Sequence, residues 1–411
     1  MQVTYIMSLI PVRSTLFLFV VFLYSLNSLG QGYLSLAGKV SDKNTKLAIP
    51  NAYVGILSKG TGTVTNTEGL FVFRFPKITS DSSLVIAVIG YKTYSVKASF
   101  FSANQKDISI ELEPAQPQIV GEGFVKQFEA GTLVRESLGK IKKNYPQTPF
   151  LLAGFYQETL QQNSDYVKVS EALIRTEKDL RPKAVVPEKV KVLRARTFEG
   201  TNRSKKLNGY EFPNGAAIVA HSIESGIPEY LNGGSINNYK FELDDSLLYY
   251  MEKSIYQIRF AAIDSGIIAA RNGKIFINST DSAIVRIEYE FLPQHIIDIF
   301  EADKSAFNKK KRVGKRLFAA VNYKPFNKKW YLQDSEMLLE TQFEDVVGSI
   351  NLHFVTNEIL KSNGNLIPEG DMMISTDDFP HQTVAKYDEI IWGSFNFILP
   401  TERMRLIKDR L

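Results

Sequence analysis

The sharpest candidate for chemistry in this sequence is a spaced set of two histidines and one glutamate. His221 is followed three residues later by Glu224, and a second histidine, His353, lies far downstream. Two imidazoles and one carboxylate can hold a zinc ion whose fourth position carries an activated water. An acidic residue three positions after a histidine also arises readily by chance at this composition. The favoured interpretation is a surface histidine beside a solvated glutamate, so we predict no catalytic residue and no metal site.

A second group combines one carboxylate with two guanidinium groups. Glu171 falls on an expected strand at 166–174, and Arg194 and Arg196 fall on another at 190–198. An arginine that faces a carboxylate across strands can form a bidentate pair that fixes the register of a sheet. The same groups could hold the anionic head of a ligand, and they are our candidate ligand-binding residues. The structural role is the favoured interpretation.

Other motifs that carry chemistry are missing from the sequence. It contains no serine nucleophile elbow, no phosphate-binding loop and no dinucleotide fingerprint. Asp244, Asp245, Asp264 and Asp281 are expected in turns, without the spacing of a calcium loop. The many aromatic residues are expected to pack in cores rather than to form sugar or lipid platforms. No cofactor is therefore predicted.

Composition restricts the class of protein. The chain has 411 residues, 44% of them apolar, which is enough for a substantial core and about two domains. Lys and Arg total 49 against 44 Asp and Glu, and this net charge of +5 is dispersed except between Lys309 and Arg316. That basic run is expected to be a solvated loop or strand edge, so no nucleic-acid partner is predicted. The absence of cysteine excludes disulfides, thiol catalysis and a lipidated N-terminal cysteine.

Residues 1–30 have the pattern of a secretory signal peptide. Arg13 is their only charged residue and precedes the apolar run Leu16–Leu26, which is shorter than the ~20 residues that a membrane-spanning helix needs. Small residues precede the expected cleavage site ahead of Gln31. A membrane anchor is the less favoured alternative, because no basic stop-transfer cluster follows. We therefore expect an exported chain with no transmembrane segment in its mature part.

Residues 31–114 are predicted to form an antiparallel β-sandwich of seven short strands. Its central stretch runs from Gly60 to Pro76, where a turn ending at Gly69 feeds an alternating strand. Gly69 suits a backbone position with positive φ. Three phenylalanines are expected on the core face of that strand: Phe71, Phe73 and Phe75.

Four spaced motifs lie within residues 33–113. They are Gly38, Val40 and Asp42; Ile49-Pro50-Asn51-Ala52; Gly62-Thr63-Val64-Thr65 with Gly69 and Phe71; and Ile89-Gly90-Tyr91-Lys92. In these motifs the region resembles the carboxypeptidase-like regulatory domain, which implies a transthyretin-like, prealbumin-like sandwich. That domain is an accessory module of some metallocarboxypeptidases and also precedes outer-membrane transporters, so the resemblance implies a fold rather than an activity. The peptidases place their catalytic domain first and build the metal site on a parallel α/β sheet, and neither feature is expected here.

Residues 115–148 are predicted to be a linker with one helix at 128–145. Residues 149–411 read as a second β-rich domain, in which 200–239 is expected to be a long loop with a short helix at 217–224. Strands and helices do not alternate, which argues against a doubly wound catalytic domain. The strands expected here are 155–160, 166–174, 190–198, 254–262, 274–278, 284–291, 330–338 and 349–356.

Three runs of this second region carry a further resemblance. They are Asn144–Ile174, VLRARTFE at 192–199 and GKIFINSTDSAIVRIEYEFLP at 273–293. They resemble the C-terminal part of uncharacterised envelope proteins that carry the same sandwich, although Gln157 stands where such relatives usually have arginine. The segment 273–288 is also similar to a strand pair of lipoprotein-carrier-type half barrels. The resemblance implies a larger, antiparallel, half-barrel-like domain in a Gram-negative cell envelope.

These patterns together predict a mainly β, exported protein with two domains. The favoured function is a non-catalytic binding or scaffold protein in the periplasm or at the periphery of the outer membrane. One alternative is a periplasmic carrier that holds a lipid or acyl group in an apolar cavity of the second domain. The other is a zinc carboxypeptidase that uses His221, Glu224 and His353. The expected partners are an envelope protein or a lipid or glycan ligand.

Overall fold

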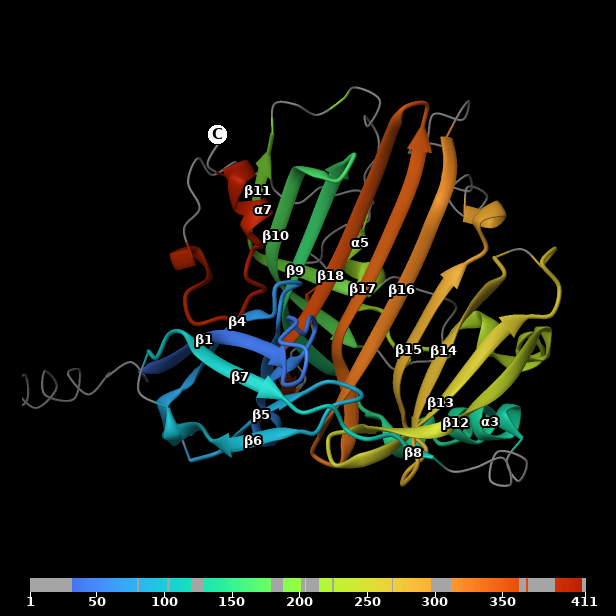
Figure 1. Cartoon of the computed structure of the whole chain (residues 1–411), viewed down its shortest axis with the longest axis horizontal. Coiled ribbons are helices and arrows are strands. Elements are labelled where there is room, and N and C mark those ends of the chain that lie inside the picture. The colour runs from blue at the N-terminus through green and yellow to red at the C-terminus, as the bar shows by residue number, and fades with distance from the viewer. Residues whose placement is uncertain are drawn as a thin grey trace, which may run out of the picture.

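Three β-sheets make up most of the chain in this computed structural model (Figure 1). The predicted signal peptide at 1–30 lies outside the described residues, as does Glu224. The structure describes residues 32–79, 81–101, 104–119, 129–178, 188–200, 204, 214–223, 225–267, 269–296, 312–361, 367–368 and 389–408.

Two small sheets form the N-terminal sandwich and confirm its seven predicted strands. The three-stranded sheet consists of β4 (Leu70–Pro76), β1 (Tyr33–Asp42) and β7 (Ile108–Leu112), in that order. The four-stranded sheet consists of β3 (Thr61–Val64), β2 (Tyr53–Ile56), β5 (Ser83–Ala87) and β6 (Tyr94–Lys97). One pairing departs from the antiparallel prediction: β1 and β7 run parallel. The whole sandwich lies between these two strands in the chain, and a parallel pair requires such a long connection.

The phenylalanine strand β4 supplies the core of the sandwich as predicted. Phe71, Phe73 and Phe75 are all buried, and the rings of Phe73 and Phe75 stack 5.2 Å apart. The turn before β4 is closed by Asn66, whose side-chain oxygen accepts hydrogen bonds from the backbone N–H groups of Glu68 and Leu70, both at 2.9 Å. Gly69 then has φ +74°, which confirms the positive φ inferred from its sequence position.

Replacing Gly69 by alanine is expected to destabilise the protein by at least about 2 kcal/mol. A Cβ there would lie 2.4 Å from the carbonyl oxygen of Val40, in addition to the strain of a positive φ. Gly90→Ala is the matched control, because Gly90 has φ +92° but a Cβ there would meet nothing within 4 Å. Urea unfolding should show a clearly larger loss for Gly69→Ala, and equal losses would contradict the clash.

The third sheet is large, open and antiparallel throughout. Its strand order is β11-β10-β9-β18-β17-β16-β15-β14-β13-β12-β8. It therefore joins the end of the sequence to its middle, since β18 pairs with β9. The strands are β8 (Gln118–Ile119), β9 (Phe150–Gln162), β10 (Asp165–Lys178), β11 (Lys189–Glu199), β12 (Tyr239–Tyr250), β13 (Lys253–Ala262), β14 (Arg271–Asn278), β15 (Ile284–Phe291), β16 (Arg312–Phe326), β17 (Lys329–Phe343) and β18 (Val346–Lys361).

Two long strands of this sheet were not predicted. β12 contains Asp244 and Asp245, which the sequence placed in a turn; both lie at an irregularity between Leu243 and Leu247 that interrupts the alternation of the strand. β16 begins at Arg312, inside the basic run that was expected to be a solvated loop or strand edge. Asp264 and Asp281 do lie between strands, as predicted.

The helices are short and cover parts of the large sheet. The single helix predicted at 128–145 is two helices, α3 (Ala130–Gly139) and α4 (Ile141–Asn144), because Lys140 adopts φ −92° and ψ 4° after Gly139. The short helix expected at 217–224 is α5 (Gly215–Ala220). No helix in the described ranges is long and apolar enough to cross a membrane. The remaining helical elements are α7 (Glu402–Lys408), η1 (Leu57–Lys59), η2 (Lys77–Thr79), η3 (Ala98–Phe100), η5 (Glu229–Leu231), η6 (Gly233–Asn238) and η8 (Glu389–Trp392).

One face of the large sheet packs against these helices. Ala130 and Val134 of α3 join an apolar cluster with Ile258 and Phe260 of β13. Helix α5 contributes Ala216, Ala217 and Val219 to a second cluster with Tyr156, Ile350 and Leu352. The described part of this face is thus filled by side chains of the protein itself, and the opposite face carries the site described below.

Candidate functional site

A row of polar side chains crosses the other face of the large sheet. Residues directly opposite each other on neighbouring strands point to the same side, so the strand register identifies the row. It covers ten strands and is interrupted only by Ala320. From β11 to β12 its members are Arg196, Glu171, Gln157, His353, Glu336, Ala320, Glu288, Lys274, Arg259 and Glu242. We call this set the polar row.

The β11 end of the polar row is a closed ion pair. Arg196 and Glu171 are each only 1% exposed, and the guanidinium binds one carboxylate oxygen of Glu171 through Nε at 2.6 Å and Nη2 at 2.5 Å. Gln157 donates to the other oxygen of Glu171 at 3.1 Å. Arg196 also lies 4.6 Å from the ring centre of Trp392. The predicted cross-strand pair is therefore formed.

The third predicted ligand-binding residue, Arg194, has a different contact. It lies two residues from Arg196 on β11, and its Nη1 donates to the carbonyl oxygen of Ile391 at 2.5 Å. This geometry favours the structural role for the three residues. Their role in ligand binding stays a prediction.

His353, in the middle of the row, is partly buried and lies beside Asp334, which is buried on the same face of β17 as Glu336. His353 Nε2 lies 3.7 Å from the Asp334 carboxylate, which also accepts hydrogen bonds from Asn322 at 2.9 Å and Gln333 at 2.8 Å. Burial alone would lower the pKa of His353, but its interaction with Asp334 and the charge of Glu336 outweigh that effect and raise it. Burial likewise opposes ionisation of Asp334, yet these partners hold its pKa below its usual value. His353 is thus committed to a structural carboxylate.

The N-terminal sandwich covers this half of the row. Asn51 donates to Glu336 at 3.5 Å. The ammonium group of Lys324 is fully buried between the two parts, where it donates to the carbonyl oxygens of Gly60 and Thr356, each at 3.3 Å. These contacts hold the sandwich on the large sheet.

The segment 389–408 ties the sandwich to the sheet from the side. Arg74 in β4 donates to the carbonyl oxygen of Gly393 at 2.7 Å, and its backbone N–H donates to Asn396 at 2.6 Å. Asn357 of β18 donates to the carbonyl oxygen of Asn396 at 2.6 Å. Trp392 packs edge-on against Phe155 with ring centres 5.3 Å apart. The closed half of the polar row is therefore sealed by two other segments of the chain.

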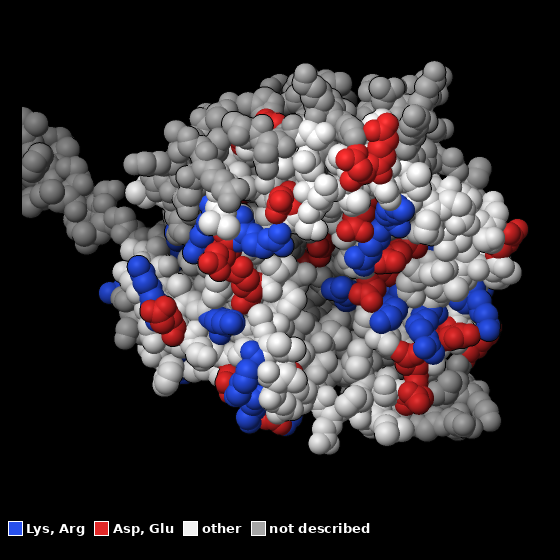
Figure 2. All heavy atoms as spheres, turned by 45° about the horizontal axis from the view of Figure 1, so that its top comes forward, with Lys and Arg blue, Asp and Glu red and all other residues white. Residues whose placement is uncertain are grey.

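The other half of the row is open and lines a pocket of about 710 Å³. Arg259, with 56% of its side chain exposed, contrasts with the buried Arg196 at the far end. Half-buried aromatic residues of β15 and β16 are among the lining residues, and Phe318 of β16 lies on the same face of the sheet as the row. On the side of the molecule shown in Figure 2, acidic and basic side chains lie next to each other rather than in separate patches. The pocket is lined by Lys240, Glu242, Arg259, Phe260, Ala261, Asn272, Gly273, Lys274, Glu288, Tyr289, Glu290, Phe291, Leu292, Pro293, Lys315, Arg316 and Phe318.

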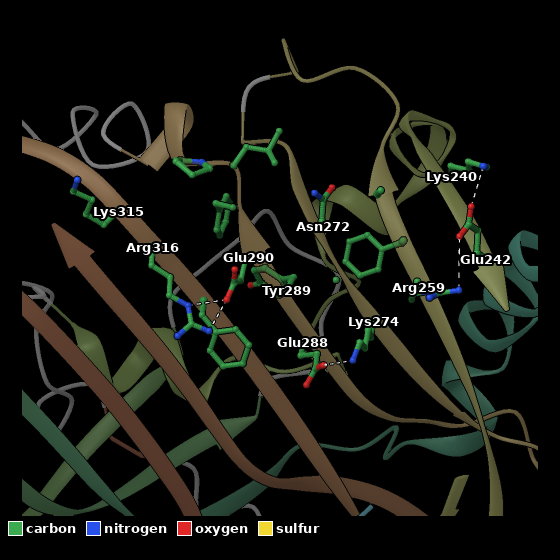
Figure 3. Close-up of a pocket in the computed structure, with 17 residues that line it drawn as sticks. Lys240, Glu242, Arg259, Asn272, Lys274, Glu288, Tyr289, Glu290, Lys315 and Arg316 are labelled. Atoms are coloured by element: carbon green, nitrogen blue, oxygen red, sulfur yellow. Dashed lines mark hydrogen bonds and ion pairs between the residues drawn. The ribbon is translucent and has the colours of Figure 1, made fainter. Parts of the chain in front are cut away.

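Ion pairs connect most of the charged groups of the pocket (Figure 3). Lys240 lies 2.9 Å from Glu242, and Arg316 lies 2.5 Å from Glu290. Lys274 points toward Glu288 at a longer distance of 3.7 Å. The interaction with Lys240 lowers the pKa of Glu242. A carboxylate that is held ionised in this way can orient a partner but is poorly suited to transfer protons near neutral pH.

His221, the first of the predicted metal ligands, lies in a different polar cluster. Its Nδ1 is 3.5 Å from Glu188, which also pairs with the buried ammonium of Lys178 at 3.2 Å. Lys178 donates to Ser222 at 2.7 Å and to the carbonyl oxygen of Ala220, the last residue of α5. The cluster therefore anchors the end of α5 to the large sheet.

The two histidines lie on opposite sides of the large sheet. Side chains alternate along a strand, and seven positions separate Glu171 from Lys178 in a regular part of β10, so Lys178 points away from the polar row. His221 belongs to the Lys178 side and His353 to the row. No three His, Asp or Glu side chains within the described ranges come together in a way that could hold a metal ion. Glu224, the third residue of the hypothesis, lies outside those ranges.

The residues of the pocket were not recognised as a site from the sequence. Lys315 and Arg316 were seen only as part of a basic run, and Lys274 and Glu288 only as part of a strand pair. Arg286, Glu288 and Glu290 do follow each other at every second position, which is the signal of a polar strand face. The sequence cannot show which strands lie beside that face.

Comparisons with known proteins agree with the sandwich. Residues 36–120 match the family model of the CarboxypepD_reg-like domain. Curated proteins give no match. A crystal structure of a DUF1329 family protein from Desulfovibrio piger aligns with 59% of this chain and 95% of its own, at 8% identity and a TM-score of 0.23, which is too low to support a functional argument. The chain therefore carries a CarboxypepD_reg-like domain, which is a regulatory-like domain and not a catalytic one. A large antiparallel sheet follows it in the sequence.

Proposed function

We propose that this protein is a non-catalytic binding protein of a Gram-negative cell envelope, exported to the periplasm or the periphery of the outer membrane. Its binding site is the pocket at the open end of the polar row. The observation that carries the proposal is the contrast along one row: the chain itself covers the Arg196 end and leaves the Arg259 end exposed as a pocket.

The size and chemistry of the pocket suit a protein partner. A volume of about 710 Å³ is in the range of small-molecule sites, roughly 300–1,000 Å³, so the pocket has room for a few side chains of a partner segment. Arginine and aromatic side chains are enriched at protein interfaces, and the pocket offers Arg259, Arg316, Tyr289, Phe291 and Phe318. Because Arg316 lies over the Phe318 ring at 5.2 Å, that ring is a poor platform for a sugar.

The two alternative functions receive less support. A carrier needs an apolar cavity for a lipid or acyl chain, whereas the described apolar face is packed with clusters and the pocket has a charged lining. A zinc carboxypeptidase needs His221 and His353 at one ion, whereas they lie on opposite sides of the sheet.

A photo-crosslinking residue at Ala261 tests the proposed site in the producing bacterium. Ala261 is an exposed position of the pocket wall, so we expect a discrete adduct with a partner after irradiation. The same crosslinker at Phe100, which is 74% exposed on the sandwich, serves as the control and should not give that adduct. The absence of an adduct from position 261, or identical adducts from both positions, would contradict the proposal.

A further inference from the structure

We propose that the pocket recognises an acidic segment of its protein partner and that Lys274 and Lys315 bind the carboxylates of that segment. The inference rests on the proposed function, because it names the chemistry of the partner at the same pocket. Three observations support it. They are the net charge of the lining, the difference between cations that are already neutralised and those that are not, and the placement of the pocket's own carboxylates.

The lining carries more positive than negative charge. Five cations line the pocket against three carboxylates, so its net charge is 5 − 3 = +2. The cations are Lys240, Arg259, Lys274, Lys315 and Arg316, and the carboxylates are Glu242, Glu288 and Glu290. A partner segment of opposite sign is therefore attracted to the pocket before it makes any contact.

Two of the five cations are the least neutralised by acidic side chains of the chain itself. Glu288 accepts two hydrogen bonds from Arg286 on one carboxylate oxygen, at 2.9 and 2.7 Å, and Lys274 lies 3.7 Å from the other oxygen. Lys315 pairs with no acidic side chain in the described part of the chain, and Figure 3 shows it apart from the ion pairs. Lys240 and Arg316 are engaged at 2.9 and 2.5 Å, and Arg259 lies 3.0 Å from Asp244. Lys274 and Lys315 therefore gain most from an incoming carboxylate.

The interspersed carboxylates favour a segment in which acidic residues are separated by other residues. Glu242, Glu288 and Glu290 would repel a uniform polyanion at each of their positions. A peptide can place a neutral or apolar side chain there and use its backbone N–H groups as donors. Half-buried Leu292 and Phe318 line the same pocket and offer apolar contacts.

Fluorescence anisotropy with short labelled peptides tests this inference on the purified protein. One peptide alternates Glu with Trp, Ser or Leu, and two companions carry Lys or Gln in place of each Glu. We expect the Glu peptide to bind at low salt, with weaker binding as salt screens the charges. The double substitution Lys274→Gln and Lys315→Gln should raise its Kd at least about tenfold. Lys46→Gln is the control, because Lys46 pairs with Glu111 on the distant sandwich surface and should leave Kd unchanged.

A substitution with the opposite expected effect separates recognition from damage to the fold. Glu290→Gln removes the partner of Arg316 and adds one unneutralised cation to the pocket, so the Glu peptide should bind roughly three- to tenfold more tightly. A misfolded protein would not bind better.

Defined outcomes would overturn the inference. These are preferred binding of the Lys peptide, no binding of the Glu peptide up to about 1 mM, or a Kd that the lysine substitutions do not change. Crosslinking distinguishes the two proposals. If an adduct at position 261 still forms in the variant with both lysine substitutions, the proposed binding site stands and the proposed recognition of an acidic segment is rejected. If no adduct forms at position 261 at all, the binding site itself is rejected.

Discussion

Replacing Lys324 by methionine is expected to remove a rise in stability that the wild-type protein shows between about pH 7 and pH 10.5. Lys324 lies between the sandwich and the large sheet with no exposed surface. Burial lowers the pKa of its ammonium group from 10.5 to about 7, although the charge of Asp334 partly opposes this shift. The ring of Tyr53 lies 5.1 Å from the nitrogen.

The direction of the effect follows from proton binding. Between about pH 7 and pH 10.5 the unfolded chain holds a proton on Lys324 that the folded protein has lost. Stability therefore increases with pH in this window, by about 1.4 kcal/mol per pH unit for one proton. Below pH 7 Lys324 is protonated in both the folded and the unfolded protein, so the buried charge lowers the stability of the folded protein by its full amount. The total over this window is on the order of 5 kcal/mol.

Urea unfolding at pH 7.5 and pH 9.5 measures this prediction. The wild type should gain roughly 2–3 kcal/mol more over this interval than Lys324→Met does. Lys46→Met, at an exposed ion pair, should behave like the wild type. Parallel pH profiles for the wild type and Lys324→Met would show that the amine keeps an ordinary pKa at the domain contact.

Breaking the Glu171–Arg196 pair is expected to cost about 3–5 kcal/mol of stability. Arg196→Met leaves a carboxylate that is almost fully buried, with Gln157 as a remaining donor. The double substitution Glu171→Met and Arg196→Met removes both charges, and we expect it to recover most of the loss. The interaction is therefore strong in a double-mutant cycle even though the pair itself adds little net stability.

Chemical unfolding of the two single variants and the double variant provides the cycle. Arg316→Met is the matched control, because the Arg316–Glu290 pair has similar geometry but is about half exposed, and its loss should cost less than about 1 kcal/mol. Losses that simply add in the double variant would mean that the two charges do not interact. A loss below about 1 kcal/mol for Arg196→Met would show that water reaches the pair.

The sequence determined those features that depend on neighbouring residues. Alternation in Phe71, Phe73 and Phe75, together with Gly69 in its turn, identified the core strand of the sandwich. Most strands of the second region were identified in the same way. β12 was not predicted, because the irregularity at Asp244 and Asp245 interrupts the alternation of side chains between the two faces of the strand. β16 was obscured by the basic run at its start.

Only the tertiary structure decided which of these strands are neighbours. Glu171, Arg196 and His353 were singled out from the sequence for two unrelated kinds of chemistry, and the register of β11, β10, β9 and β18 places them in one row. That row joins residues more than 150 positions apart because β18 returns to pair with β9. A local pattern specifies the side of a strand on which a residue lies, but the pairing of distant strands depends on the free energy of the whole core. The sequence therefore determined where most strands lie, and the tertiary structure decided that one end of the polar row is sealed while the other forms a pocket.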